Sequence, residues 1–482
     1  MILAQAAHAA GDAPVPALIW VLPFAALLLC IAVLPLLKRT EHWWHHNHNK
    51  LIVAVLLAIV TLAYYWMRNF GAAVHDPFLV ELFHSLGLHV HEHEGHRLAA
   101  PGAAAAAAAL GNGMMEYIPF MSLLFSLYVI SGGITVRGDI PAHPRTNVAF
   151  LAIGGVMASL IGTTGASMLL IRPLLKTNSE RKHVVHTVVF FIFIVSNIGG
   201  TLLPIGDPPL FLGYLKGVPF LWTLVLWKEW AFAIFVLLGI YYAWDLVAYK
   251  KETLPTVHLD ETRVEKLSVS GKINFLFLAG VVLATGTLAP GKPFLGTSWE
   301  PFPFCRELVQ NAFVLLSLAF TAKGLRKENN FNYVAILEVA CLFIGIFVCM
   351  QVPIEILNAK GSALGINSPA KFFWATGSLS SFLDNAPTYV VFFETAKAMA
   401  AGPGAGIMNI LGGGHIRIDF LTAISLGSVF MGANTYIGNG PNFMVKSIAE
   451  HAGVKMPSFF GYMLFSACIL LPTFLLVMLI FI

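Results

Sequence analysis

The sequence is poor in charge and in cysteine. Charged side chains make up 11% of its 482 residues and hydrophobic ones 57%, whereas about a quarter of the residues of soluble proteins are charged. The five cysteines, at positions 30, 305, 341, 349 and 468, have no disulfide or zinc spacing. Residues 1–16 contain no Lys or Arg, unlike a signal peptide. We therefore expect no soluble module, no cofactor and no nucleic-acid partner.

The sequence does contain many apolar runs of about 20 residues, long enough to cross a bilayer as helices. Two further apolar stretches are interrupted by polar residues with Gly or Pro. Because a helix break at membrane depth must be buried or line a wet cavity, we interpret both as re-entrant hairpins. The expected fold is an all-α polytopic membrane protein. Its ten spans are 17–37, 51–67, 116–136, 185–197, 222–247, 271–289, 306–322, 331–352, 418–437 and 458–482, and its hairpins are 148–175 and 371–398.

The basic residues favour this topology. With the N-terminus outside and each hairpin returning to its own side, most of the 29 Lys and Arg residues lie in inside segments, as the positive-inside rule requires. A charged linker at 248–270 separates a first half, 1–247, from a second half, 271–482. Each half has three spans, a hairpin and two more spans, in opposite orientations. This is an inverted repeat, which is typical of secondary transporters.

Two Gly- and Pro-rich segments support the repeat. SNIGGTLLPIGDPPL at 196–210 aligns without gaps to SVFMGANTYIGNGPN at 428–442, with five identities: Ser196/Ser428, Gly200/Gly432, Ile205/Ile437, Gly206/Gly438 and Pro209/Pro441. Because Gly and Pro are poor helix formers, we expect an unwound helix at 196–210 and another at 432–443. With the two hairpin tips, these breaks would meet near the bilayer midplane.

Oxygen-bearing side chains gather at the four predicted breaks, where exposed carbonyl groups and half-helix ends are also available. Such oxygens suit small cations. The alternative for each Asn or Thr is that it only caps a half-helix. The candidate ligands are Ser196, Asn197, Thr201 and Asp207 in the first half and Asn434, Thr435, Asn439 and Asn442 in the second; the tips add Thr163, Thr164 and Gly165, and Asp384, Asn385, Ala386 and Pro387.

Asp384, within SSFLDNAPTY at 380–389, is the strongest candidate. An ionisable residue at membrane depth is costly and functional by default, although Asp384 or Asn385 could also cap a helix with Pro387 in its first turn. Burial favours the protonated acid and a nearby cation favours the carboxylate. One acid can therefore hold a proton or a cation, but not both, which is the minimal chemistry of an antiporter.

Other acids are weaker candidates. Asp207 precedes two prolines, where it could instead be an ordinary turn residue. Glu338 lies within a predicted span. Three more acids, Asp245, Glu394 and Asp419, lie near predicted span ends, and we expect them to be solvated.

SNIGGTLLPIGDPP, followed by a hairpin with LDNAPT, resembles the ion transporter superfamily of sodium/carboxylate symporters, arsenite permeases and NhaD-type sodium/proton antiporters. The resemblance implies a homodimer of inverted repeats in the bacterial inner membrane, with a scaffold domain and a mobile, elevator-like transport domain. Carboxylate carriers of this group have Ser-Asn-Thr at both tips. Here the tips are Thr163-Thr164-Gly165 and Leu383-Asp384-Asn385. An acid there repels an anionic substrate unless a cation bridges them.

The second tip is more similar to that of the NhaD-type antiporters. The resemblance therefore implies a transporter, not an enzyme, that exchanges Na⁺ or Li⁺ for H⁺. Transport of citrate, a dicarboxylate or an arsenite-type anion is the alternative, because both groups share the Gly- and Pro-rich segments.

The 17 histidines raise a distant alternative. HWWHH at 42–46 and HVHEH at 89–93 match His boxes of membrane di-iron enzymes, but the topology places 42–48 and 84–96 on opposite sides of the membrane. HVHEHEGH at 89–96 could instead bind a transition metal or sense pH. The adjoining PGAAAAAAALGNG at 101–113 is expected to be a low-complexity linker.

Overall fold

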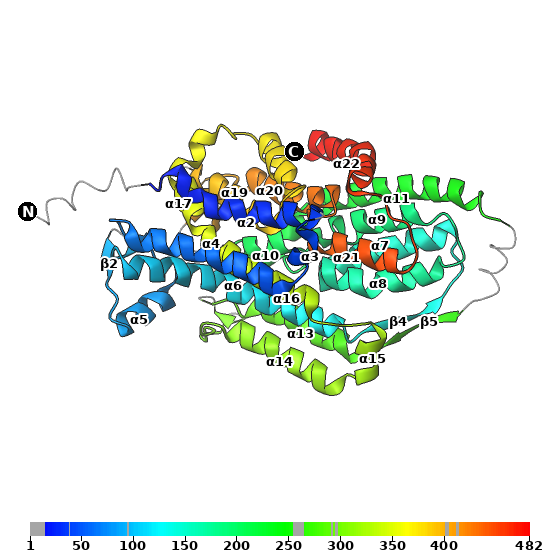
Figure 1. Ribbon diagram of the computed structural model, residues 1–482, viewed down its shortest axis with the longest axis horizontal. Helices are drawn as coiled ribbons and strands as arrows, with labels where there is room; N and C mark the ends of the chain where they lie inside the picture. Colours follow the sequence, from blue (N-terminus) through cyan, green and yellow to red (C-terminus); the bar gives the residue numbers. More distant parts are fainter. Residues whose placement is uncertain are drawn as a thin grey trace, which may run out of the picture. The chain divides into compact units, whose positions relative to one another are not determined.

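The chain forms two compact units. Figure 1 shows the helices and strands that build them. The first contains Met1–Tyr117, Leu337–Gly365 and Glu394–Ala400, and the second contains Ile118–Ile336, Ile366–Phe393 and Ala401–Ile482. Each unit takes segments from both predicted repeats, so the repeats and the units divide the chain differently. The computed structural model describes residues 15–37, 39–93, 96–253, 265–290, 293–294, 297–400, 404–410 and 414–482.

The first unit combines apolar helices with a small antiparallel sheet of strand order β1-β3-β2. Its core joins Tyr65 on α4, Leu79 and Phe83 on α5, Ala105 on α6 and Val352 on α17. Its elements are η1 (Leu18–Val21), α2 (Leu22–Val33), η2 (Leu34–Leu36), α3 (Glu41–Trp44), α4 (Asn47–Met67), β1 (Ala72–Ala73), α5 (Pro77–Ser85), β2 (Val90–His93), β3 (His96–Ala99), most of α16 (Val334–Cys349), α17 (Gln351–Lys360), η6 (Gly361–Leu364) and the first half of α6 (Ala103–Ser131).

The second unit is built around α9 (Val185–Ile194), whose apolar side chains are buried on every side, as expected of a central helix. The other elements before the linker are β4 (Thr135–Asp139), α7 (Pro144–Ile161), α8 (Thr163–Thr177), η3 (Ile198–Thr201), α10 (Pro208–Leu215), η4 (Phe220–Leu226) and α11 (Trp227–Tyr249). After the linker come β5 (Glu265–Ser270), α13 (Ile273–Thr287), α14 (Cys305–Phe320), α15 (Lys323–Glu328), α18 (Pro369–Ser380), most of α19 (Asn385–Ala398), β6 (Ile407–Ile410), β7 (Gly414–Arg417), α20 (Ile418–Met431), η7 (Gly432–Asn434), α21 (Gly440–His451) and α22 (Phe459–Phe481).

In the described part of the chain, five helical segments are long and apolar enough to cross a membrane: α4, α6, α7, the joined pair η4–α11, and α22. The pair α16 and α17, bent by 41°, would make a sixth. The protein is therefore a mostly helical, multi-pass membrane protein. A helix lies in each of the ten expected spans, but several are shorter than 18 residues. Helix α7, expected as half of a hairpin, is long enough to span by itself.

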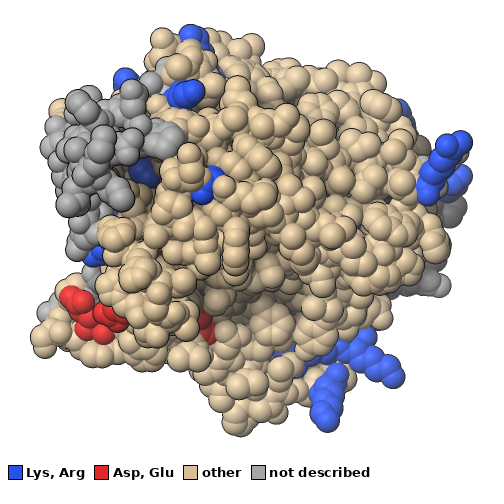
Figure 2. Space-filling model, turned by 60° about the vertical axis from the view of Figure 1, so that its left-hand side comes forward, with Lys and Arg blue, Asp and Glu red and all other residues tan. Residues whose placement is uncertain are grey.

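Large apolar side chains are exposed on many helices, as lipid contact would require. Phe235 on α11 and Phe460 on α22 are each 78% exposed, and Leu479 near the end of α22 is 68% exposed. Most of the face drawn in Figure 2 carries neither basic nor acidic side chains. Exposed large apolar side chains mark membrane or protein interaction surfaces, and here those of α11 and α22 lie on helices long and apolar enough to span a membrane.

Two sequence-based predictions about connecting segments are wrong. Residues 101–113 are not a linker, because α6 begins at Ala103. Alanine is the best helix former, and Ala104, Ala105, Ala108 and Ala109 are spaced to form one buried helix face. The linker 248–270 is partly a strand: Glu265–Ser270 pairs with β4, with Val269 opposite Val136. Residues 254–264 of that linker lie outside the described residues.

Candidate functional site

Both predicted hairpins contain a helix break in the second unit. Helix α7 ends at Ile161 and α8 begins at Thr163. Gly162 between them has φ 81°, a backbone conformation that favours glycine, so the chain can reverse there without a side-chain clash. Helix α18 ends at Ser380 and α19 begins at Asn385, and a short turn that ends at Asp384 connects them.

The two Gly- and Pro-rich segments have the same local structure. Each follows an apolar helix with a 3₁₀ turn, η3 or η7, and then begins a new helix after Asp207 or Asn439. These two residues occupy equivalent positions in the ungapped alignment. Their backbones are nearly identical, with φ −143° and ψ 141° at Asp207 and φ −153° and ψ 139° at Asn439. Helices begin earlier than expected, at Pro208 and Gly440, so the unwound parts are shorter than predicted.

Matched glycines allow both segments to fold tightly. A Cβ atom on Gly438 would lie 2.6 Å from the carbonyl oxygen of Gly432, and one on Gly206 would lie closer still to that of Gly200. Real Cβ atoms essentially never approach other atoms so closely. The two pairs therefore make the same close backbone approach, which is the structural counterpart of the aligned glycines.

Hydrogen bonds to Asp207 bring the four breaks together. Its Oδ1 accepts from Thr163 Oγ1 at 2.9 Å and from Asn439 Nδ2 at 3.0 Å, and its Oδ2 accepts from Asn385 Nδ2 at 2.6 Å. All four side chains are at most 3% exposed. We call Thr163, Asp207, Asn385 and Asn439 the Asp207 cluster. One carboxylate thus joins both hairpin tips and both unwound segments.

A second layer of amides supports this cluster. Asn197 Nδ2 donates to Asn442 Oδ1 at 2.7 Å, and Asn197 Oδ1 accepts from Asn439 Nδ2 at 3.2 Å. Asn442 Nδ2 donates to the carbonyl oxygens of Gly432 and Thr435 at 2.8 and 2.9 Å. The two unwound segments are therefore connected side chain to side chain, which fixes the orientation of the Asn439 amide toward Asp207.

Asp384 lies beside this cluster but has a different role in the fold. It is only partly buried. Its Oδ1 accepts from the backbone N–H of Ala386 at 3.1 Å, and its carbonyl oxygen accepts from Thr388 Oγ1 at 3.0 Å. Asp384 therefore caps the start of α19, the structural alternative considered above. Ala386 and Pro387 form the first turn of that helix and are buried.

Two amide oxygens near the second tip have no partner. Asn385 Oδ1 and Asn434 Oδ1 are buried and accept no hydrogen bond. The donation from Asn385 Nδ2 to the Asp207 carboxylate fixes which amide atom is the unpaired oxygen. Ser381 Oγ donates its proton to the carbonyl oxygen of Gly377 at 2.8 Å, so it accepts from Asn434 Nδ2 at 2.9 Å, and this assigns the Asn434 oxygen. A buried acceptor without a donor costs about 1–3 kcal/mol, and a cation bound to such an oxygen would remove that cost.

The remaining candidates hold the breaks in shape. Ser196 Oγ shares a hydrogen bond of 2.8 Å with Ser167 Oγ, and Thr201 Oγ1 donates to the carbonyl of Ile198 at 2.6 Å. Thr435 Oγ1 donates to the carbonyl of Ser381 at 2.5 Å. These contacts are local supports of the breaks. Thr164 and Gly165 follow Thr163 in the first turn of α8.

Ser381 was not among the sequence-based candidates, although its Oγ and carbonyl join the second tip to the second unwound segment. The available signal was its place three residues before Asp384, within the quoted stretch SSFLDNAPTY. Serine is common in such loops, so the type of residue alone did not distinguish it.

The charge of the site is negative. Four helices, α8, α10, α19 and α21, begin at the breaks and four end there, so the partial charges of about +0.5 and −0.5 at helix ends nearly cancel. What remains, when both are ionised, is the charge of two carboxylates, Asp207 and Asp384, which then repel each other. No Lys, Arg or His side chain in the described part of the chain donates a hydrogen bond to the Asp207 cluster. The site therefore favours a cation or a proton.

Asp245 on α11 is a second buried carboxylate of this unit. The expectation that Asp245 and Glu394 are solvated is wrong, since they are 0% and 3% exposed. Arg181 Nη2 donates to Asp245 Oδ1 at 2.5 Å, and His186 Nε2 lies 2.8 Å from the same oxygen. We call Asn147, Arg181, His186, Tyr241 and Asp245 the Asp245 cluster. Glu394 pairs with Lys397 at 3.0 Å.

The other acids behave as expected. Asp419 is 42% exposed at its side chain and pairs with Arg417. Glu338 is 43% exposed at its side chain and lies 2.7 Å from Lys50 Nζ, so it is an ion-pair partner near a helix end.

The histidine hypotheses gain no support. Among the described residues, no group of three or more His, Cys, Asp or Glu side chains could hold a metal ion. In 42–48, imidazole centroids lie 5.5 Å apart for His42 and His46 and 5.4 Å apart for His46 and His48. Part of 89–96 lies outside the described residues.

Comparison with known proteins identifies a transporter family. The family described as "Putative citrate transport" matches residues 13–88 and 96–482, which is nearly the whole chain. The match includes all four helix breaks and the Asp207 cluster. No individually curated protein matches the sequence.

Proposed function

Because the chain belongs to this citrate transport family, we propose that it is a secondary active transporter that exchanges Na⁺ or Li⁺ for H⁺. The Asp207 cluster, with Asp384 beside it, is the proposed binding site. The Na⁺ or Li⁺ ion and the proton bind there in alternation. Membership of the family supports transport, and the chemistry of the site supports Na⁺ or Li⁺ and H⁺ as the transported ions.

The observation that carries this proposal is the excess of buried oxygen acceptors over donors. Asp207 is 1% exposed and receives three hydrogen bonds, all from uncharged groups. Asn385 Oδ1 and Asn434 Oδ1 add two acceptors without partners. A buried carboxylate without a counter-charge is unfavourable by several kcal/mol. Either a proton on the acid or a small cation among these oxygens removes that cost.

Competition follows from the geometry. A cation bound at Asp207 needs the ionised carboxylate, whereas protonation removes the charge that attracts the cation. The partly buried Asp384, at the tip of the second hairpin, offers the first carboxylate that an entering ion would meet. Release of the proton and binding of the cation are then alternative states of one site. Exchange of one ion for the other requires only that the empty, ionised site does not cross the membrane.

The resemblance to the ion transporter superfamily supports two further parts of the proposal. We infer a homodimer in a bacterial inner membrane with the N-terminus outside. We also infer that the four breaks move together as part of an elevator-like transport domain within an inverted repeat. The common local structure of the two Gly- and Pro-rich segments, and the hydrogen bond between their equivalent residues Asp207 and Asn439, support the repeat.

Sodium-coupled transport of citrate or a similar carboxylate is the second candidate, and the family description favours it. Four helix N-termini meet at the breaks, and such termini attract anions. Two carboxylates oppose an anion at the same place. Citrate transport therefore needs a cation between Asp384 and the substrate, so both candidates share the cation site and differ in the second substrate.

Ion exchange in proteoliposomes with an imposed pH gradient tests the proposal. Na⁺, Li⁺, K⁺ or labelled citrate is added in turn to wild type, Asp384→Asn and the surface control Asp419→Asn. We expect Na⁺ or Li⁺ to dissipate the gradient for wild type and Asp419→Asn, and Asp384→Asn to respond weakly or not at all. If the cations leave the gradient unchanged and citrate enters only with sodium, the exchanger is excluded and the carboxylate symporter is favoured.

A further inference from the structure

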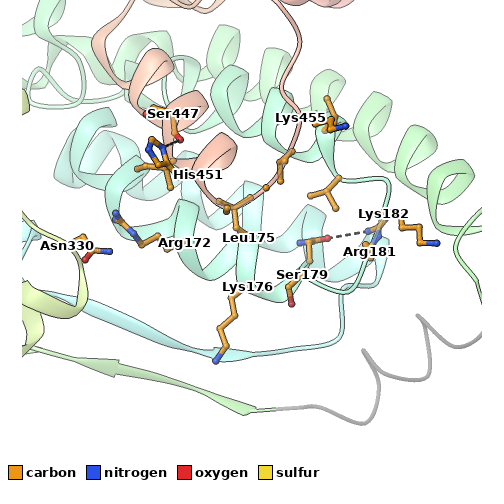
Figure 3. Close-up of a pocket in the computed structure, with 17 residues that line it drawn as sticks. Arg172, Leu175, Lys176, Ser179, Arg181, Lys182, Asn330, Ser447, His451 and Lys455 are labelled. Atoms are coloured by element: carbon orange, nitrogen blue, oxygen red, sulfur yellow. Dashed lines mark hydrogen bonds between the residues drawn. The ribbon is translucent and has the colours of Figure 1, made fainter. Parts of the chain in front are cut away.

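A large basic cavity lies in the second unit, outside the Asp207 cluster. Its volume is about 910 Å³, and it is bounded by α8, the following loop, the start of α9 and the end of α21. Five basic side chains line it: Arg172, Lys176, Arg181, Lys182 and Lys455. Figure 3 shows that they come from several sides, with Arg172 and Lys176 on α8 and Lys455 beyond α21. No Asp or Glu is among its described lining residues.

Most of this positive charge is not neutralised. Lys176 pairs with Glu265, and Arg181 pairs with Asp245. No ion pair holds Arg172, Lys182 or Lys455 among the residues that the structure describes. Arg172 is half-buried, so water screens its charge less than at the surface. Arg181 is 6% exposed, and its Nε has no hydrogen-bond partner. The cavity therefore has unused hydrogen-bond donors and an unbalanced charge.

A smaller cavity of about 210 Å³ adjoins it, because Lys182 and Val185 line both. It adds Lys251 and the apolar side chains Trp244 and Phe465. Trp244 is 40% exposed and stacks on Phe465 with ring centroids 5.7 Å apart. Both lie on helices long and apolar enough to span the membrane. Basic groups here border an exposed aromatic and apolar surface, as at a lipid headgroup boundary.

We propose that the basic cavity binds a polyanion through its phosphate groups, and that the occupant is the headgroup of an anionic phospholipid. Guanidinium and ammonium groups are the usual partners of phosphate, and basic pockets between membrane helices bind anionic headgroups. The adjoining apolar surface at Trp244 and Phe465 favours a lipid over a soluble phosphate, because an acyl chain can lie along it. The proposal is independent of the transported ion.

Lipid titration with the purified full-length protein in a neutral detergent tests this site. Bound lipid is counted by native mass spectrometry with cardiolipin, phosphatidylglycerol or phosphatidylcholine as probes. Pyrophosphate and citrate are added separately as soluble competitors. The test variant is Arg172→Gln/Lys182→Gln/Lys455→Gln. The matched control is Lys272→Gln/Lys323→Gln/Lys327→Gln, which removes the same number of charges at exposed positions.

We expect wild type and the control to bind cardiolipin more tightly than phosphatidylcholine. The cavity variant should bind cardiolipin on the order of a hundredfold more weakly, from about 1 kcal/mol per lost charge. Displacement of the lipid by millimolar pyrophosphate or citrate would support recognition of its anionic headgroup. Binding of these soluble anions without binding of cardiolipin would overturn the lipid as the occupant. Equal cardiolipin affinity of the cavity and control variants overturns the proposal. If the triple variant does not fold, the exposed single variant Lys182→Gln should still weaken binding about fivefold.

Discussion

Asp207 and Asp245 are both buried aspartates of the second unit, yet their surroundings differ in charge. Asp207 accepts hydrogen bonds from Thr163, Asn385 and Asn439, all uncharged. Asp245 accepts from the Arg181 guanidinium at 2.5 and 3.2 Å and contacts His186 at 2.8 Å. The protein supplies the counter-charge for Asp245 from its own side chains. For Asp207 it supplies only neutral hydrogen-bond donors, one hydroxyl and two amides.

This difference separates a structural acid from a binding acid. A carboxylate with a permanent cationic partner is already neutralised, and a second cation would gain little from it. A carboxylate held only by amides and a hydroxyl has its geometry fixed while its charge stays uncompensated. Burial alone, at 1% and 0% exposure, would not distinguish them.

The largest expected effect is on transport by Asp207→Asn. This change keeps the size of the side chain but removes the only charge of the Asp207 cluster, so the cation loses its main attraction. We expect Na⁺-driven proton flux to fall to the level of protein-free liposomes, while the folded protein loses only about 1–3 kcal/mol for one mismatched hydrogen bond. Flux in proteoliposomes and thermal unfolding in detergent measure the two effects. Flux near that of wild type would remove Asp207 from the proposed mechanism.

The next effect is on stability, at the Asp245 cluster. Arg181→Ala leaves a buried carboxylate without its guanidinium partner, and breaking a buried ion pair in this way costs about 3–5 kcal/mol. We expect a large fall in unfolding temperature. The double variant Arg181→Met/Asp245→Leu removes both charges and should recover much of the loss. A double variant no more stable than the single one would mean that the pair is needed for more than charge balance.

Local signals account for most of what the sequence predicted correctly. Apolar runs predict helices because a span needs about 20 apolar residues. Gly162, with its positive φ, and the closely approaching pairs Gly200/Gly206 and Gly432/Gly438 break helices in a way that only glycine tolerates. The same reasoning failed at Ala103, where a repetitive composition suggested a linker although alanine strongly favours helix.

Local sequence patterns do not predict which residues far apart in the chain pair with each other. Asp245 lies near the end of α11 in sequence, which suggested solvent, but Arg181 and His186 come from 64 and 59 residues away to cover it. The bond from Asn385 to Asp207 joins residues 178 apart. The sequence ranked Asp384 above Asp207, since Asp384 is expected at membrane depth whereas Asp207 precedes two prolines and could be an ordinary turn residue. The tertiary structure makes Asp207 the residue on which the four breaks converge.

A matched pair of Asn variants sharpens the comparison. Asn385→Ala removes a donor to Asp207 and an unpaired oxygen, so we expect Na⁺ half-saturation to rise about 10-fold for a loss of about 1.4 kcal/mol. Asn147→Ala removes a donor to Asp245, 3.3 Å from its Oδ2. That variant should lose stability and keep the Na⁺ half-saturation of wild type. A change in half-saturation for both would mean that the two clusters are coupled.

The smallest expected effect concerns an exposed ion pair, Arg137 and Glu328, outside the membrane spans. Arg137 donates to Glu328 and lowers the pKa of that carboxyl below 4.5. Because the folded pKa is lower than the unfolded one, the pair stabilises the protein above the ordinary pKa, and the contribution is lost as pH falls through the lowered value. Solvent screens both partners, so Arg137→Gln should leave thermal unfolding at pH 7 nearly unchanged. A fall in unfolding temperature as large as that of Arg181→Ala would mean that burial does not decide how much an ion pair stabilises this protein. The contrast between Asp207 and Asp245 would then need another cause.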